Sequence, residues 1–128
     1  MAMKPKTVGV INQQVIQKLG LHITENTPIM LGKTNIEHMK SEHPNDFRKY
    51  FKYLPDILSA PDYIAKHPNK TSIEYIKTFY DEDKKDYVLV AVRASNNNVF
   101  YARSLFVMSD EKIEKYRRKG ALIKYEKE

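Results

Sequence analysis

The chain has 128 residues, of which 41% are hydrophobic and 30% charged, so we expect one globular domain, residues 1–128, with a single core. The absence of cysteine excludes a disulfide framework, thiolate chemistry and cysteine-based zinc sites, and it fits a cytosolic protein. The net charge of +6 favours a polyanionic partner such as nucleic acid, and the lack of a long apolar run argues against a membrane partner.

Short elements alternate with polar turns at the start of the chain. Residues 7–11 predict a strand, and apolar residues at helical spacing predict a helix over residues 12–19. Gly20 suits the left-handed conformation in which many helices end. A second short strand is predicted over residues 28–31.

A helix that carries two histidines is predicted next. Thr34 and Glu37 have the spacing of a capping box, so the helix should begin there. It should end at His43, because Pro44 disfavours helical geometry in the residue before it. Aromatic residues at helical spacing predict a second helical segment over residues 45–54.

The middle of the chain changes from a loop to a strand. Residues 65–71, with their proline and asparagine, predict a polar loop. Residues 72–80 alternate well enough for a strand, with Ile73 and Tyr75 on one side and Ile76 on the other.

Residues 86–108 carry the strongest local signal in the chain. Two runs of β-branched and aromatic residues flank a Ser-Asn-Asn-Asn turn, which predicts a β-hairpin. If odd positions pair with odd ones, the even positions form an almost wholly apolar core face: Val88, Val90, Val92, Phe100, Ala102 and Phe106. The opposite face then gathers Arg93, Tyr101 and Arg103. Ser104 faces away from these three residues unless a β-bulge intervenes.

One more helix is predicted near the C-terminus. Ser109 is the expected N-cap, and the helix should run to Lys119 and stop at Gly120, before a final short strand near residues 122–125. The order of elements predicts an α+β fold. In it, N-terminal helices pack on one face of a small, about four-stranded antiparallel sheet, and a C-terminal helix follows.

Two histidines are candidate acid–base groups. His38 and His43 lie five residues apart, about 140° around a helix, which is the wrong spacing for a pair of metal ligands. Glu42 lies one turn from His38 and could fix its tautomer and raise its basicity. The alternative is that His38 is a surface residue and that His43 only ends the helix, where a cation suits the dipole. The sequence does not choose between the two histidines.

The two hairpin arginines are candidate phosphate ligands. Planar guanidinium groups bind phosphate oxygens bidentately and stabilise the charge of a phosphodiester transition state. Arg93 and Arg103, held on strands, suit that task, and Tyr101 between them could stack on a base or donate a proton. The alternative is a solvated outer face on which the arginine stems lie along the sheet.

Several other signals of catalysis are missing. The chain has no glycine-rich phosphate loop, no Gly-x-Ser-x-Gly motif and no carboxylate cluster with metal spacing, so neither a metal nor a cofactor is expected. RNA supplies its own nucleophile, the 2′-OH, and its cleavage needs only a base, an acid and cationic stabilisation. Histidine, arginine and tyrosine are sufficient for that chemistry.

Four sequence blocks follow one another along the chain in the order typical of one protein family. They are residues 35–44 (NIEHMKSEHP), 60–64 (APDYI), 88–93 (VLVAVR) and 101–106 (YARSLF). Together they resemble a phage- and mobile-element-associated nuclease domain of the barnase–EndoU–colicin–RelE-like superfamily. The resemblance covers about residues 28–123.

The resemblance implies a metal-independent ribonuclease with N-terminal helices packed on a four-stranded antiparallel sheet. It also implies catalysis by a helix histidine, His38 or His43, with Arg93, Arg103 and Ser104 from the sheet. Threonine often stands in the family where this chain has Ser104, so the hydroxyl is retained.

We therefore expect a toxin-like endoribonuclease of phage or mobile-element origin that acts in the bacterial cytoplasm. The candidate catalytic residues are His38, His43, Arg93, Tyr101, Arg103 and Ser104. The cations expected to hold the RNA backbone are Lys33, Lys40, Arg117, Arg118 and Lys119. Besides RNA, a protein antitoxin, immunity protein or host protein is an expected partner. The alternatives are a non-catalytic module on the same fold that binds nucleic acid or protein, and a phage structural component.

Overall fold

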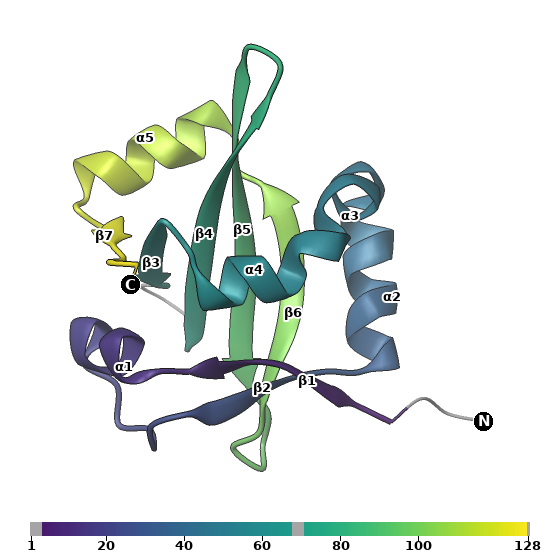
Figure 1. Ribbon diagram of the computed structural model, residues 1–128, viewed down its shortest axis with the longest axis vertical. Coiled ribbons are helices and arrows are strands. Elements are labelled where there is room, and N and C mark those ends of the chain that lie inside the picture. Colours follow the sequence, from purple (N-terminus) through teal and green to yellow (C-terminus); the bar gives the residue numbers. More distant parts are fainter. Residues whose placement is uncertain (1–3, 68–70, 128) are drawn as a thin grey trace.

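The computed structural model describes residues 4–67 and 71–127, and Figure 1 shows how their helices and strands are arranged. The strands are β1 (Lys6–Ile11), β2 (Thr27–Leu31), β3 (Tyr63–Lys66), β4 (Ser72–Asp81), β5 (Lys84–Ala94), β6 (Phe100–Val107) and β7 (Ile123–Lys124). The helices are α1 (Gln13–Leu19), α2 (Lys33–Glu42), α3 (Pro44–Tyr50), α4 (Leu54–Ser59) and α5 (Asp110–Arg118), with a 3₁₀ turn, η1 (Phe51–Tyr53), between α3 and α4.

The strands of the described residues form one seven-stranded sheet in the order β1-β2-β6-β5-β4-β3-β7. β2 pairs with β6 in parallel, and the other neighbouring strands are antiparallel. The α+β class is confirmed, but the prediction of about four antiparallel strands is wrong. Local sequence patterns identify β1 and β2 as strands, yet they do not show that β2 joins the sheet beside a strand far along the chain.

The sheet has two faces, which different helices cover. On the first face, the main core packs against Leu54, Ile57 and Leu58 of α4, which crosses in front of β4 and β5 in Figure 1. Buried residues of α1, α2 and α3 join the same core. On the second face, a smaller cluster contains Ile113 of α5. The N-terminal helices thus cover one face, as predicted, whereas the C-terminal helix covers part of the opposite face.

The strands β3 and β4 bear on two predictions, the alternation of residues 72–80 and the loop over residues 65–71. Ile73 and Tyr75 are buried in the first-face core and Ile76 in the second-face cluster, so the alternation predicted for β4 is confirmed. The loop predicted over residues 65–71 is wrong at its start, because β3 continues to Lys66 and its Ala65 is fully buried. Residues 68–70 of that predicted loop lie outside the described residues.

The β5–β6 hairpin has the predicted register only near its turn, where Arg93 pairs with Tyr101. A β-bulge at Arg103 follows, and beyond it odd residues of β5 pair with even residues of β6. The bulge therefore reverses the parity of the rest of β6. Phe106 belongs to the second-face cluster, so its predicted place on the core face is wrong. Ser104 therefore lies on the same face as Arg93, as predicted for the case in which a β-bulge intervenes.

The ends of the helices show one correction and one confirmation. α2 begins after Gly32, whose amide donates a hydrogen bond to Asn35 Oδ1 at 2.8 Å, so the capping box predicted at Thr34 is wrong. Ser109 caps α5 as predicted, because its Oγ accepts a hydrogen bond from the amide of Lys112 at 3.2 Å. No helix in residues 4–67 and 71–127 is long and apolar enough to cross a membrane.

Candidate active site

A polar row crosses three strands on the second face of the sheet, at the end away from the β4–β5 turn. Ser72 of β4 pairs with Arg93 of β5, which pairs with Tyr101 of β6. His67 extends the row past the end of β3, where its amide donates to the carbonyl of Ser72 at 3.1 Å. Arg93 is fixed within the row, because its Nε donates to Ser72 Oγ at 3.1 Å.

The next row on the same face has smaller side chains on β5 and β6 than the row of Arg93 and Tyr101 has. Glu74 of β4 pairs with Ala91 of β5, which pairs with Ser104 of β6. Arg103, the extra residue of the bulge, is exposed and lies between Ala102, buried on the first face, and Ser104. The fold therefore brings three of the four predicted hairpin residues, Arg93, Tyr101 and Ser104, to one face, and Arg103 is exposed at the bulge next to Ser104.

Glu74 is a buried carboxylate that α5 holds in place. Only 4% of the residue is exposed, and the hydroxyl of Tyr116 donates a hydrogen bond of 2.7 Å to Glu74 Oε1. Burial and this hydrogen bond raise the pKa of the Tyr116 phenol above its ordinary value. Tyr116 is therefore neutral near pH 7 and points its proton at the carboxylate.

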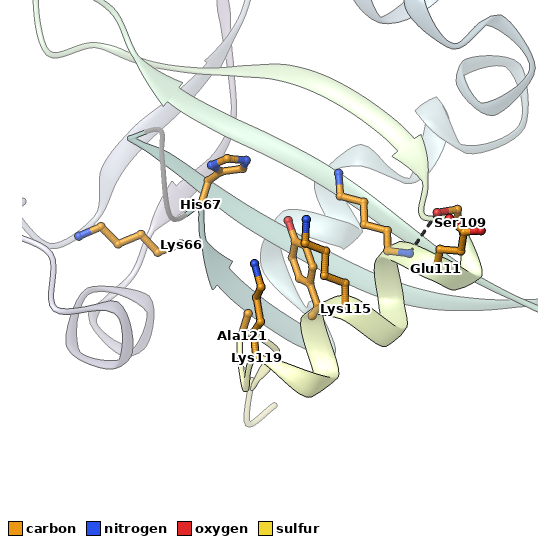
Figure 2. A pocket seen from close by; sticks show the side chains of 9 residues that line it. Lys66, His67, Ser109, Glu111, Lys115, Lys119 and Ala121 are labelled. Atoms are coloured by element: carbon orange, nitrogen blue, oxygen red, sulfur yellow. Dashed lines mark hydrogen bonds between the residues drawn. The ribbon is translucent and has the colours of Figure 1, made fainter.

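A cavity of about 450 Å³ lies between α5 and the end of β3. Its lining includes His67, Tyr116, two lysines of α5, Lys112 and Lys115, and Lys119, the residue that caps the end of α5. Figure 2 shows His67 reaching toward the same space as Lys115 and Lys119, whereas Lys66 points away. Four of these residues lie three or four positions apart, so one side of α5 presents them together. The cavity is basic and contains one imidazole and one phenol.

The helix α2, which carries His38 and is followed directly by His43, stands at the edge of β6 that is left open beyond the pairing of β6 with β2. There α3 closes the edge, because Asp46 Oδ2 accepts a hydrogen bond from the amide of Val107 at 2.9 Å. His43 packs on Phe106 with ring centroids 5.0 Å apart, and the ammonium of Lys112 lies 4.6 Å from the centroid of the same ring. His43 therefore borders the second face on the side of β6, while His67 borders it on the side of β3.

The other helix histidine and its neighbours face different surroundings. His38 Nδ1 lies 3.9 Å from Glu42 Oε1, and both side chains are largely exposed. Lys33 Nζ lies 4.0 Å from Glu37 Oε1. The Lys40 ammonium lies 5.9 Å from the ring centroid of Phe47, a residue of the first-face core. The structure does not bring these α2 residues into the cavity beside α5.

The predicted cluster at the end of α5 lies close to the candidate site. Lys119 lines the cavity, and Arg117 donates a hydrogen bond of 3.0 Å from its guanidinium to the hydroxyl of Tyr87. Arg118 is exposed.

The sequence prediction missed three residues of this site: His67, Glu74 and Tyr116. Glu74 had a usable signal, because it is a charged residue inside a strand whose neighbours alternate between two apolar faces. Tyr116 also had one, since it shares a helix side with three lysines. His67 had none, because its position follows from the pairing of β3 with β4. In residues 4–67 and 71–127, no group of three or more histidine, aspartate or glutamate side chains could hold a metal ion.

The fold and the site define an α+β protein with a basic, polar sheet face suited to binding phosphate groups. The chain belongs to the family described as phage-Barnase-EndoU-ColicinE5/D-RelE like nuclease3, whose profile matches residues 5–115. The predicted family is thereby confirmed. No curated protein and no solved structure matched the chain.

Proposed function

We propose that this protein is a metal-independent endoribonuclease that cleaves RNA on the second face of its sheet. The observation that carries the proposal is the position of Arg93, hydrogen-bonded to Ser72 in a polar row and one residue pair away from the Glu74–Tyr116 pair. A cationic group and a proton acceptor are thereby held on rigid strands within the reach of one phosphodiester. Membership of a nuclease family supports the same conclusion.

The arginines would stabilise the reacting phosphate. Attack of the 2′-OH on phosphorus gives a pentacoordinate species with additional negative charge on its oxygens. Arg93 is oriented in advance by Ser72, and Arg103 projects from the bulge beside it. Donors fixed in advance stabilise developing charge without having to reorganise.

Three proton transfers would complete the reaction. As O2′ attacks phosphorus, the 2′-OH gives its proton to Tyr116 Oη, and Tyr116 passes its own proton to Glu74. Protonated His67 gives a proton to the departing 5′ oxygen as the P–O5′ bond breaks. The products are a 2′,3′-cyclic phosphate and a 5′-OH end. Tyr116 begins and ends neutral, which agrees with its raised pKa.

Two further predicted residues of the sheet and the lysines that line the cavity would bind the substrate. Tyr101 ends the polar row next to Arg93 and presents a ring for a base to stack on, and Ser104 offers a hydroxyl one row away. Lys112, Lys115 and Lys119 would contact phosphates on either side of the cleaved bond. His43, packed on Phe106 beside Lys112, is the alternative proton donor, and His38 is more distant from the cavity lining.

The test is incubation of a defined single-stranded RNA with the purified protein in EDTA. We expect cleavage products that end in 2′,3′-cyclic phosphate, detected by mass spectrometry. A matched RNA with 2′-deoxy sugars at the cleaved positions should resist cleavage, because it lacks the internal nucleophile. Intact RNA, or equal cleavage of the two substrates, would contradict the proposal.

The second candidate function is a non-catalytic module that binds nucleic acid through the same basic face. The three lysines on one side of α5 favour it, because they need no chemistry to bind phosphates. Filter binding of RNA over a salt series separates the two functions. Salt-sensitive retention without any product supports a binding module, whereas no retention favours a protein partner such as an antitoxin, an immunity protein or a host protein.

A further inference from the structure

A second hollow, of about 690 Å³, lies nearer the β4–β5 turn and is separate from the cavity that contains His67. We call it the hairpin groove. Its cations and aromatic rings are Lys77, Lys85, Lys124, Lys127, Tyr63, Tyr80 and Tyr125. Its volume falls within the range of small-ligand sites, about 300 to 1,000 Å³.

The lysines of the hairpin groove are only partly neutralised. Asp62, one of the two carboxylates in its lining, already binds Lys127 at 2.5 Å and the amide of Thr78 at 2.6 Å. Lys77 is held in place by a hydrogen bond of 2.7 Å to the carbonyl of Ala60. Burial and the nearby Lys127 lower the pKa of the Lys77 ammonium. An anion between these ammonium groups would relieve their mutual repulsion.

An exposed aromatic ring stands beside these cations. Tyr80 is 76% exposed, far more than the other large apolar residues on the described surface, Val10 and Val99. The Lys85 ammonium lies 5.9 Å from the ring centroid of Tyr80 and 5.1 Å from that of Tyr87. An exposed ring next to a lysine offers a base one surface for stacking and its phosphate one cation.

The C-terminal end of α5 connects the hairpin groove with the candidate active site. The Arg117 guanidinium lies 5.9 Å from the ring centroid of Tyr87, the same ring that Lys85 covers. Two residues further on, Lys119 lines the cavity of the active site. Lys85 and Arg117 therefore share the ring of Tyr87, and Lys119 places a further cation at the cavity, close to Arg117 along the chain.

We propose that the hairpin groove binds single-stranded RNA that flanks the cleaved bond. One base stacks on Tyr80, and its phosphates lie against Lys77, Lys85 and Lys124. This inference rests on the proposed ribonuclease function and names its substrate as an extended single strand. The strand passes over Arg117 to the cavity. An exposed ring among lysines fits a flexible strand with splayed bases better than an acidic protein surface, which needs the cations alone.

The experiment measures fluorescence anisotropy with 2′-O-methyl RNAs, which cannot be cleaved, of about 4 and about 12 nucleotides. The parent protein should bind the longer RNA more tightly than the shorter RNA, because only the longer RNA can reach the hairpin groove. Tyr80→Ala should weaken binding of the longer RNA by about tenfold and leave binding of the shorter RNA unchanged, because one stacked base is lost. Tyr80→Phe should keep most of the affinity, since the ring remains.

A matched pair of lysine variants controls for charge. Lys52 lies 5.3 Å from the ring centroid of Tyr53, much as Lys85 lies over Tyr80, but among the helices of the first face. Lys85→Gln should weaken binding of the longer RNA, and Lys52→Gln should not. Equal effects of the two variants would overturn the proposal, and so would parental affinity of Tyr80→Ala. Competition by polyglutamate that does not depend on Tyr80 would instead identify an acidic protein as the partner.

Cleavage kinetics separate this inference from the proposed function. Tyr80→Ala should raise KM for the longer RNA and leave cleavage of a dinucleotide unchanged. If RNA is cleaved and Tyr80→Ala behaves as the parent on both substrates, only the hairpin-groove proposal fails. If no RNA is cleaved but binding still depends on length and on Tyr80, only the ribonuclease proposal fails.

Discussion

The two faces of this sheet are built from the same strands but differ in how completely helices cover them. On the first face, Ile57 of α4 and Val90 of β5 are fully buried, and several helices close the surface. On the second face, α5 covers one end, and the polar row runs from Tyr101 and Arg93 to His67, which lines an open cavity. The difference shows that coverage, and not the strands themselves, decides where polar side chains can be held rigidly and still reach a ligand.

The largest expected effect separates the two edges of the second face. If His67 is the proton donor, His67→Gln should lower the cleavage rate about 10²- to 10⁴-fold, the usual contribution of general acid catalysis. His43→Gln should lower it by less than about tenfold, because that ring packs on Phe106 at the opposite edge. Single-turnover rates on one RNA substrate measure both variants, and the reverse order of effects would assign the role to His43.

A stability change should mark the first face. Ile57→Ala removes a fully buried side chain from the main core and should lower the free energy of unfolding by about 2 to 5 kcal/mol. Urea denaturation followed by circular dichroism gives this value. Arg103→Gln, on the open face, should change it by less than about 0.5 kcal/mol. A comparable loss in both variants would remove the distinction between the faces.

Two tyrosines, the buried Tyr50 and the half-buried Tyr116, extend the comparison to high pH. Burial and a hydrogen bond to Asp86 raise the pKa of Tyr50 to about 12, and Tyr116 is raised by burial and Glu74 on the second face. A raised phenol pKa means that the folded state keeps its proton longer than the unfolded state does. The stability due to each pair is therefore complete below about pH 10 and is lost as the pH rises through the raised pKa.

Tyr50→Phe and Tyr116→Phe should each make the loss of stability above about pH 10 less steep, as urea denaturation at a series of pH values will show. Only Tyr116→Phe should also slow RNA cleavage near pH 7, because Tyr50 belongs to the first-face core. An unchanged pH dependence in Tyr116→Phe would contradict its coupling to Glu74 in the folded state.

The smallest effect concerns the lysines. Lys119→Gln should reduce the salt dependence of RNA binding by about one charge, because Lys119 lines the cavity. Lys40→Gln should leave it unchanged, since the Lys40 ammonium lies over Phe47. Filter binding at several salt concentrations measures both slopes, and equal slopes for the two variants would place the RNA elsewhere.

How much of this could be predicted from the sequence depends on whether a feature is local. Alternation along the hairpin placed Arg93 and Tyr101 together, because the side-chain period of a strand is fixed at two residues. The same alternation placed Phe106 on the wrong face, since nothing in the period marks Arg103 as an extra residue. A bulge is a feature of pairing between strands, which a single strand does not reveal.

The missed site residues have the same physical origin. His67 reaches the site only because β3 pairs with β4. The polar residues around His67 predict a loop, so the sequence does not indicate this pairing. The alternation of β4 predicts Glu74 as a strand residue, but it does not indicate the hydrogen bond to Tyr116, which lies on a helix far along the chain. A local sequence pattern can indicate an acid–base group on a helix, as it does for the helix histidines. It does not indicate where that helix lies relative to the sheet.

The most direct test of the account compares an arginine of the second face with an arginine of the helical layer. Arg93 donates to Ser72 on the open face, and Arg48 of α3 donates to Asn45 at 3.3 Å on the exposed surface of the helical layer. RNA cleavage in EDTA should fall about 10²- to 10³-fold in Arg93→Gln, with an unchanged urea midpoint, and stay at the parental rate in Arg48→Gln. Parental cleavage by Arg93→Gln would contradict the assignment of the second face as the site of reaction.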